Sequence, residues 1–282
     1  MSAPERIPPQ PGVDAEEVLA RGALTVHGRI VEASNAVLYA TAELAGARLP
    51  CVYKPVAGER PLWDFPDGTL AQREVAAYEV SRALGWELVP PTVLRDGPMG
   101  EGMCQQWVGP APDAEEDEAP GPDGLLALVE AETPEPGWKA VGFAEVDAGR
   151  TALLVHADDE RLRRLAALDA VINNGDRKGG HLLPLPDGRL YAIDHGVTFH
   201  TDNKLRTLLW GWAGEPLPDP VREALRGLSA ELAEGRPLAG RLAALITPAE
   251  RDALRARTET LLRTGRHPTP SGEWPAFPWP LV

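Results

Sequence analysis

Two aspartates that each follow an apolar run and sit in a glycine-containing turn constrain this chain more than any other feature. Asp176 lies in residues 173–181, which read Asn-Asn-Gly-Asp-Arg-Lys-Gly-Gly-His, and an Asp-His-Gly turn begins thirteen residues later at Asp194. An apolar element that ends in such a turn holds a carboxylate in place and leaves it open to a ligand. We therefore expect Asp176 and Asp194 to belong to one site.

The length and composition fit a folded protein without membrane spans. The 282 residues can form one large domain or two modest lobes, and 43% of them are hydrophobic. No apolar run is as long as a transmembrane helix, which needs about eighteen residues. Cys51 and Cys104 lie in apolar runs, which predicts buried reduced thiols and favours the cytoplasm. The start is proline-rich and lacks an apolar signal core, so we assign residues 1–20 to a flexible leader.

Acidic residues are concentrated in one stretch. The formal net charge is −14, and residues 109–137 contain nine acids and no lysine or arginine. We assign this stretch, which is rich in proline and glycine, to a solvated linker or insert. The negative charge disfavours nucleic acid as a partner and stable association with an anionic membrane surface.

The part before the linker predicts a small antiparallel sheet with one helix. A helical pattern covers residues 70–84, with Asp67 or Thr69 as caps and Gly85 as the end. Strand-like runs lie on both sides of it, at 24–30, 36–43, 48–54, 88–95 and 103–108. This succession differs from a repeated βαβ array, and we assign residues 21–108 to an N-terminal lobe.

The part after the linker predicts a larger, mainly helical lobe at residues 138–282. Its helix after Asp158 or Asp159 has leucines at helical spacing. Short strands are expected at 140–146, 151–156, 182–185 and 190–193, mainly helical structure at 205–266, and an extended Trp/Pro-rich arm at 271–282. The predicted fold class is therefore α+β, with two lobes.

The segment around Asp176 has the residue types that phosphoryl transfer requires. That reaction needs a positioned hydroxyl and neutralised charge, and little covalent help from the protein. Asp176 can orient the attacking hydroxyl, Lys178 can neutralise the transferring group, and His181 can reach a metal held by Asp194. The alternative is a polar turn in which Asp176 and Asn174 cap backbone amides.

Asp194 has the position of a metal ligand. The short apolar strand that ends at Ile193 delivers its carboxylate, and Gly196 permits a sharp turn. Hard divalent cations prefer oxygen ligands and keep waters alongside the phosphates of a nucleotide. The alternative is an ordinary aspartate at the end of a strand.

Lys54 and Glu74 are predicted to form an ion pair. Lys54 closes an apolar strand, and the alternation along that strand points its side chain into the protein. Glu74 falls on the buried stripe of the following helix, whereas Glu79 falls opposite. A buried ammonium needs an anionic partner, which Glu74 can supply. The alternative is an exposed lysine and a glutamate at the edge of the apolar face.

Two further segments are placed by their order along the chain. Ser34 and Asn35 lie between the first two strands, where turn amides and the Ser34 hydroxyl could bind phosphate. The run Gln105, Gln106, Trp107 and Val108 ends the N-terminal lobe, where backbone groups could hydrogen-bond an adenine ring.

Three histidines near Asp194 leave a second kind of site open. His181, His195 and His200 could together form a transition-metal site of a hydrolase. Their spacings are irregular and no histidine pair has the spacing of a helix-borne metal motif, so we favour the phosphoryl-transfer interpretation.

With Lys54, Glu74, Asp176, His181 and Asp194 in this order, the chain resembles the phosphatidylinositol 3/4-kinase-like and HipA-like branch of the protein-kinase-like superfamily. It is more similar still to an actinobacterial group that carries the same label. The resemblance covers residues 24 to about 215. That branch usually has Asp-Arg-His-x-x-Asn, whereas this chain has Lys178 and His181 at the third and sixth places.

The resemblance implies an enzyme that uses ATP and a divalent metal in a cleft between two lobes. Lys54, held by Glu74, would touch the phosphates, Asp176 would be the base, and Asp194 would bind Mg²⁺. An imidazole at His181 is a softer ligand than an amide oxygen, which makes Mn²⁺ possible. The acceptor would be a protein side chain or a small hydroxylated molecule. A nucleotide-binding pseudokinase and an AMP transferase remain alternatives on the same fold.

Overall fold

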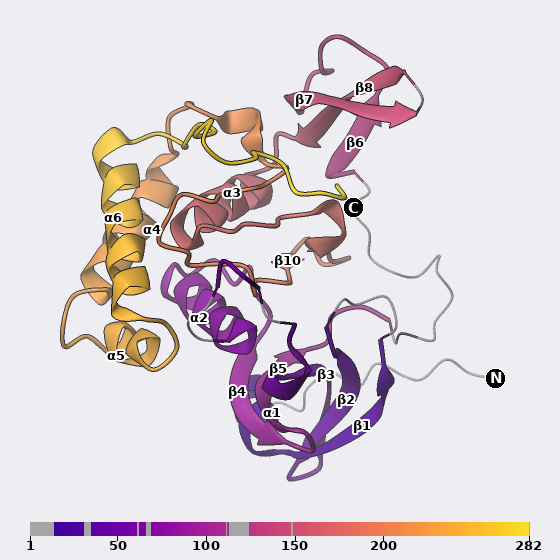
Figure 1. Cartoon of the computed structure of the whole chain (residues 1–282), viewed down its shortest axis with the longest axis vertical. Helices are drawn as coiled ribbons and strands as arrows, with labels where there is room; N and C mark the ends of the chain where they lie inside the picture. Colours follow the sequence, from indigo (N-terminus) through magenta and orange to yellow (C-terminus); the bar gives the residue numbers. More distant parts are fainter. Residues whose placement is uncertain are drawn as a thin grey trace.

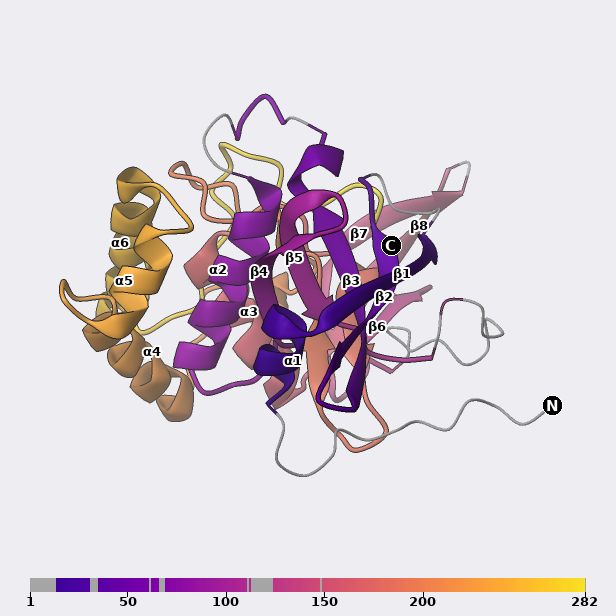
Figure 2. The same ribbon diagram turned by 90° about the horizontal axis from the view of Figure 1, so that it is seen from below.

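A computed structural model describes residues 14–30, 35–60, 62–65, 69–110, 112, 124–147 and 149–281. These residues form a smaller lobe built on an antiparallel sheet and a larger lobe with most of the helices, as the sequence predicts (Figure 1). Figure 2, seen from below, shows the helices nearest the C-terminus (orange to yellow) on one side and most of the strands on the other. Within the described part of the chain, no helix has both the length and the apolar character needed to cross a bilayer.

The smaller lobe contains five antiparallel strands in the order β1-β2-β3-β5-β4. They are β1 (Ala23–Arg29), β2 (Leu38–Leu44), β3 (Ala47–Pro55), β4 (Thr92–Gly97) and β5 (Gly100–Gln106). Side chains alternate across the sheet, so Cys51 on β3 packs on one face while Lys54 lies on the other. This alternation directs the Lys54 ammonium toward the larger lobe.

A helix that the sequence did not predict supports the outer face of this sheet. Helix α1 (Ala15–Arg21) lies partly inside the segment assigned to a flexible leader. Asp14 caps it, and Val18 and Leu19 are buried against the sheet residues around Cys51. Seven residues are too few for a helix that is stable alone, so tertiary packing decides that α1 forms.

The larger lobe is organised around α3 (Glu160–Ile172), which Asp159 caps. Helices α4 (Asp219–Glu231), α5 (Pro237–Ala243) and α6 (Pro248–Thr264) complete it, and β9 (Leu182–Pro184) pairs with β10 (Leu190–Ala192). Helix was expected from residue 205, but residues 205–218 contain only the 3-10 turn Trp210–Trp212. The backbone of this segment pairs with the Asp176 loop and not with itself. The Arg206 amide donates a hydrogen bond to the Asn174 carbonyl, and Thr207 forms a parallel β-bridge with Arg177.

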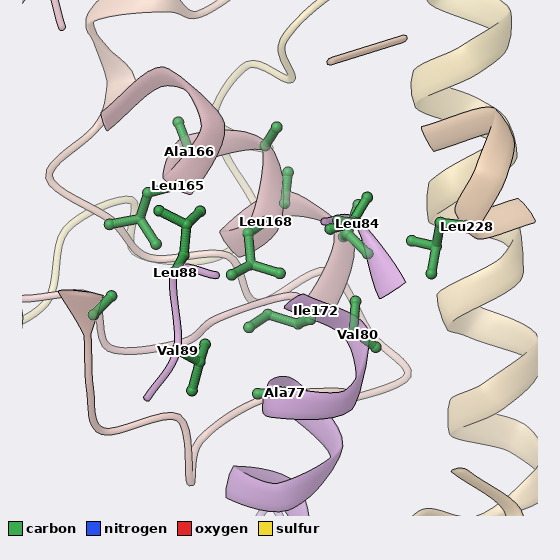
Figure 3. Packing of buried hydrophobic residues seen from close by; sticks show 14 of the residues in the cluster. Ala77, Val80, Leu84, Leu88, Val89, Leu165, Ala166, Leu168, Ile172 and Leu228 are labelled. Carbon is green, nitrogen blue, oxygen red and sulfur yellow. The ribbon is translucent and has the colours of Figure 1, made fainter. Parts of the chain in front are cut away.

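Helix α2 (Leu70–Ala83) lies between the lobes and is buried on almost every side. Thr69 and Gln72 form a capping box at its start. One side of α2 packs on β4 and β5, and the other contacts α3, α4 and α5. In Figure 3 its residues Ala77 and Val80 meet Leu168 and Ile172 of α3. Glu79, predicted to lie opposite the buried stripe, is also buried and accepts a hydrogen bond from Arg241 at 2.8 Å.

A second antiparallel sheet extends from the larger lobe (Figure 1). Its strands β6 (Leu126–Val129), β8 (Arg150–Ala157) and β7 (Trp138–Asp147) lie in that order. Strand β6 falls within the stretch 109–137 that the sequence assigned to a linker. Its four residues are apolar, and pairing with β8 gives their backbone groups partners.

The residues after α6 run back along the larger lobe as an extended arm. The Ala276 carbonyl accepts from the Thr207 amide and from the indole of Trp210, and the Leu281 carbonyl accepts from the Gly179 amide. The arm is therefore fixed beside the loop that carries Asp176.

Candidate active site

Three elements far apart in the sequence bring Lys54, Glu74 and Asp194 together. The Lys54 ammonium on β3 lies 2.7 Å from Glu74 Oε1 on α2 and 3.2 Å from Asp194 Oδ1. The predicted Lys54–Glu74 ion pair is therefore present. The second oxygen of Glu74 accepts a hydrogen bond from the His195 amide at 2.8 Å, so α2 also holds the turn that carries Asp194.

The Asp194 turn is tightly constrained. Asp194 has a φ of 61°, in the left-handed region that few residues other than glycine and asparagine adopt. A Cβ at Gly196 would lie 3.2 Å from the Leu70 Cβ, so the turn approaches α2 closely. The Lys54 charge lowers the pKa of Asp194 despite the opposing effect of burial. Burial alone would lower the pKa of Lys54, but Glu74 and Asp194 together raise it. Both groups are therefore charged at neutral pH.

Asp176 lies in the loop after α3, flanked by two cations. Its carboxylate is 3.2 Å from Lys178 Nζ and 3.8 Å from Arg206 Nη2, and its amide donates to the Asn174 side chain at 3.0 Å. Burial raises the pKa of Asp176, Lys178 opposes this, and the charge of Asp194 adds to it. The two aspartates are thus close enough for the charge of Asp194 to affect the pKa of Asp176. Arg206 was not foreseen.

His181 faces Asp194 from the 3-10 turn Gly179–His181. Its Nε2 lies 3.4 Å from Asp194 Oδ2, and its Nδ1 accepts from the Lys178 amide at 3.4 Å. This network places the ring proton on Nε2. Burial lowers the pKa of His181 to about 4, so the ring is neutral at pH 7. A metal could use Nε2 only after displacing that proton, whereas the half-exposed Asp194 carboxylate offers oxygen ligands directly.

Asp194 and His181 suit a metal ion that takes most of its ligands from a nucleotide and from water. Among the described residues, no group of three or more His, Cys, Asp and Glu side chains could hold a metal. Asp194 and His181 would supply one or two ligands, which leaves positions for phosphate oxygens and water, as Mg²⁺ prefers. The same observation disfavours the hydrolase interpretation, because His195 and His200 do not join His181 in a ligand cluster. His195 is fully buried against Arg177 instead.

A buried charge network that sequence reasoning missed connects the two aspartate loops. Arg177 and Asp169 are both fully buried and form a two-pronged ion pair, with nitrogen–oxygen distances of 3.0 and 3.1 Å. Arg177 also donates to the Ile193 carbonyl and to His195 Nε2, and Asn174 donates to Asp169. Asp169 lies at helical spacing from Leu162, Leu165 and Ile172 on the buried stripe of α3, a signal that could have revealed it.

The segment expected to meet an adenine ring lies at the end of β5 and just after it, and most of its backbone amides already have partners. Gln105 is buried and donates to the Thr92 hydroxyl at 2.8 Å. The amides of Gln106 and Trp107 donate to the carbonyls of Pro91 and Pro50. Within the described chain the Val108 amide has no such partner, which leaves it as the candidate donor to a base.

The segment predicted to bind phosphate, Ser34 and Asn35, is described only in part. Ser34 lies outside the described residues. The Asn35 side chain accepts a hydrogen bond from the Arg60 amide at 3.0 Å, which ties the loop between β1 and β2 to the chain after β3.

Solved structures of similar fold are known, although they share little sequence with this chain. No protein-family model matches the chain. Two solved structures share its fold: the Golgi casein kinase with Mn/ADP bound (TM-score 0.53, 14% identity, covering 95% of this chain and 79% of that one) and hydra Fam20 with sugar (TM-score 0.54, 13% identity, covering 88% and 86%). At this identity the likeness establishes the fold alone.

A sequence relative is much closer to this chain. Protein Rv2133c of Mycobacterium tuberculosis (strain ATCC 25618 / H37Rv) is 54% identical over 268 residues, which are 95% of each chain. The chain therefore has a two-lobed, protein-kinase-like fold and belongs to the same family as Rv2133c.

Proposed function

We propose that this protein is an ATP-dependent phosphotransferase with its active site in the cleft between the lobes. The observation that carries the proposal is the meeting of Lys54, Glu74 and Asp194, with Asp176 close by. A paired lysine, a metal-binding carboxylate and a separate base are the parts that kinases use. The Golgi casein kinase of similar fold has Mn/ADP bound, which supports a nucleotide and a divalent cation here.

The nucleotide end of the cleft is assigned to Lys54, Asp194 and Val108. Lys54, fixed by Glu74, would bind phosphate oxygens, and the Val108 amide would meet the base. Asp194, with His181 if its ring proton is displaced, would hold Mg²⁺ or Mn²⁺. Such an ion neutralises negative charge on the phosphates when it is bound.

The transfer step is assigned to Asp176. An acceptor hydroxyl oxygen bonds to the γ-phosphorus as the bond from that phosphorus to ADP breaks, and the hydroxyl proton passes to the Asp176 carboxylate. The raised pKa of Asp176 favours this proton transfer. Lys178 and Arg206, on either side of the carboxylate, would neutralise the transferring group.

The finer assignments are proposals as well. The order of Lys54, Asp176, His181 and Asp194 supports the phosphatidylinositol 3/4-kinase-like and HipA-like branch. The acceptor would be a protein side chain or a small hydroxylated molecule. The negative net charge of the protein argues against an acceptor that lies in an anionic membrane surface. The buried free thiols of Cys51 and Cys104 support a cytoplasmic location.

Replacing the base tests the proposal. Purified protein with a divalent metal should transfer label from γ-labelled ATP to itself or to a cell extract. Asp176→Asn should lower that rate by about 10²- to 10⁴-fold, the usual contribution of a general base. Asp187→Asn, the same change at an exposed turn, should have no effect.

Other outcomes identify the alternatives. Transfer that is unchanged in Asp176→Asn would contradict the assigned base. A rise in melting temperature with ATP but no transfer would indicate a pseudokinase, since ligand binding stabilises the folded state by mass action. Label transferred only from the α-phosphate would indicate an AMP transferase.

A further inference from the structure

A groove begins at Asp176, and its chemistry bears on the acceptor. The first part is a pocket of about 490 Å³ that includes Asp176, Arg206, Trp63 and Trp274 in its lining. The second part, of about 460 Å³, extends to Asp202 and Glu273. Trp63, Asp64 and Trp274 line both parts, so the two are continuous. The inference drawn from this groove rests on the proposed function.

The shared wall of the groove already contacts a cationic side chain of the protein itself, Lys204. The Lys204 ammonium lies 4.5 Å from the ring centroid of Trp274 and 5.2 Å from that of Trp63, and 2.8 Å from Asp64 Oδ2. Indole faces attract cations, most strongly where water is excluded. Trp63 is 83% exposed, so most of its ring remains accessible to a second cation.

The far end of the groove has an excess of negative charge. Asp202 and Glu273 are exposed, and among the described residues no lysine or arginine pairs with either of them. The nearest histidine, His200, accepts a hydrogen bond from the Asp202 amide at its Nδ1 (2.9 Å). Lys204 neutralises only Asp64, so two carboxylates remain to face a ligand.

The two ends of the groove are therefore of opposite sign. Lys178 and Arg206 flank the base at the near end, where a phosphoryl group would arrive. Carboxylates and indole rings form the far end, which would attract a cation and repel an anion.

We propose that the far end of this groove binds a cationic group of the acceptor, so that the hydroxyl to be phosphorylated lies near an amine or a guanidinium. A lysine or arginine next to a serine or threonine in a peptide supplies this chemistry, and so does the amine of a small amino alcohol or amino sugar. The same charges disfavour an acidic acceptor.

Matched acceptors test the charge rule. Three serine peptides that differ only in carrying lysine, glutamine or glutamate beside the serine should be phosphorylated in that order of kcat/KM. Glucosamine, glucose and N-acetylglucosamine compare a cationic with two neutral small molecules, with the amine, hydroxyl or amide at one position. The series that shows the preference identifies the source of the cation. Equal rates in both series, or preference for the glutamate peptide, would overturn the proposal.

Charge-neutral variants locate the effect. Asp202→Asn with Glu273→Gln should raise KM for the preferred cationic acceptor about fivefold per carboxylate, the ratio that about 1 kcal/mol represents. KM for the neutral acceptor and the affinity for ATP should not change. The matched control is Asp219→Asn with Glu223→Gln on α4, which changes net charge equally at exposed sites away from the groove. Identical KM values in the two double variants would contradict the proposal.

A binding measurement separates this proposal from the proposed function. If the protein phosphorylates none of these acceptors, calorimetry with the same peptides and sugars still reports on the groove. A cationic probe should bind about 25-fold more tightly than its neutral counterpart, about fivefold for each carboxylate, and Asp202→Asn with Glu273→Gln should remove the difference. Equal affinities for the cationic and neutral probes would overturn the charge rule, whether or not the protein is a kinase.

Discussion

The Asp194 end and the Asp176 end of the cleft are built in different ways. At the Asp194 end, buried charged side chains hold one another: Glu74 is 2% exposed and reaches both Lys54 and the His195 amide. At the Asp176 end the walls are formed by a short N-lobe segment with Trp63 and by the C-terminal arm with Trp274. Under the proposed function, the Asp194 end would hold the phosphates of the nucleotide and the Asp176 end would admit the acceptor.

The two aspartates show the same contrast in their electrostatics. Lys54 lowers the pKa of Asp194, whereas burial raises the pKa of Asp176 even with Lys178 beside it. Environments that move two nearby carboxyl groups in opposite directions are typical of sites that give them different tasks. The predictions below test this contrast, beginning with the largest expected effect.

Breaking the buried network should destabilise the whole protein. Arg177→Met leaves Asp169 as an unpaired buried charge, which typically costs about 3–5 kcal/mol. Urea unfolding measures the loss. The matched control is Arg189→Met, which breaks a solvent-exposed pair with Asp187 and should cost far less, because water screens exposed charges. Equal losses would mean that the Asp194 end is no more firmly held than the surface.

Replacing each aspartate should change stability in opposite directions. The folded pKa of Asp176 is raised, so the folded chain binds its proton more tightly than the unfolded chain does. Above the unfolded value, about 3.9, its ionised carboxylate therefore costs folding free energy, and Asp176→Asn should raise the melting temperature at pH 7.

The sign is reversed for Asp194. Its folded pKa is lowered, so its stabilisation is present above the unfolded value and is lost as the pH falls through the folded value. Asp194→Asn should therefore lower the melting temperature at pH 7, by about 2–4 °C for each kcal/mol lost from the free energy of unfolding. Calorimetry measures both shifts, and shifts of the same sign would contradict the contrast.

The smallest effect is expected at the acceptor end. Asp64→Asn removes the carboxylate that pairs with Lys204, but the ammonium keeps its two indole faces. We expect a loss of about 1 kcal/mol in the free energy of unfolding. Asp252→Asn, at an exposed pair on α6, is the control. A loss as large as that of Arg177→Met would show that this end is rigidly built as well.

Much of the cleft could be predicted from local patterns. Strand alternation directed Lys54 inward, and helical spacing placed Glu74 on a buried stripe, so their contact followed from charge pairing. Asp176 and Asp194 were identified because each ends an apolar run in a turn with glycine. The same reasoning failed for α1 and β6, which are too short to have a pattern of their own and depend on the surfaces that they cover.

The amino-acid sequence by itself determined which side chains point inward and which turns can present a carboxylate, because these depend on neighbours a few residues away. Apart from the Lys54–Glu74 pair, only the tertiary structure decided which of them meet. Lys54 and Asp194 are separated by 140 positions, as are Asp64 and Lys204, and no periodic pattern links residues so far apart. The packing of the two lobes and of the C-terminal arm brings them together, and with them the groove beside Asp176.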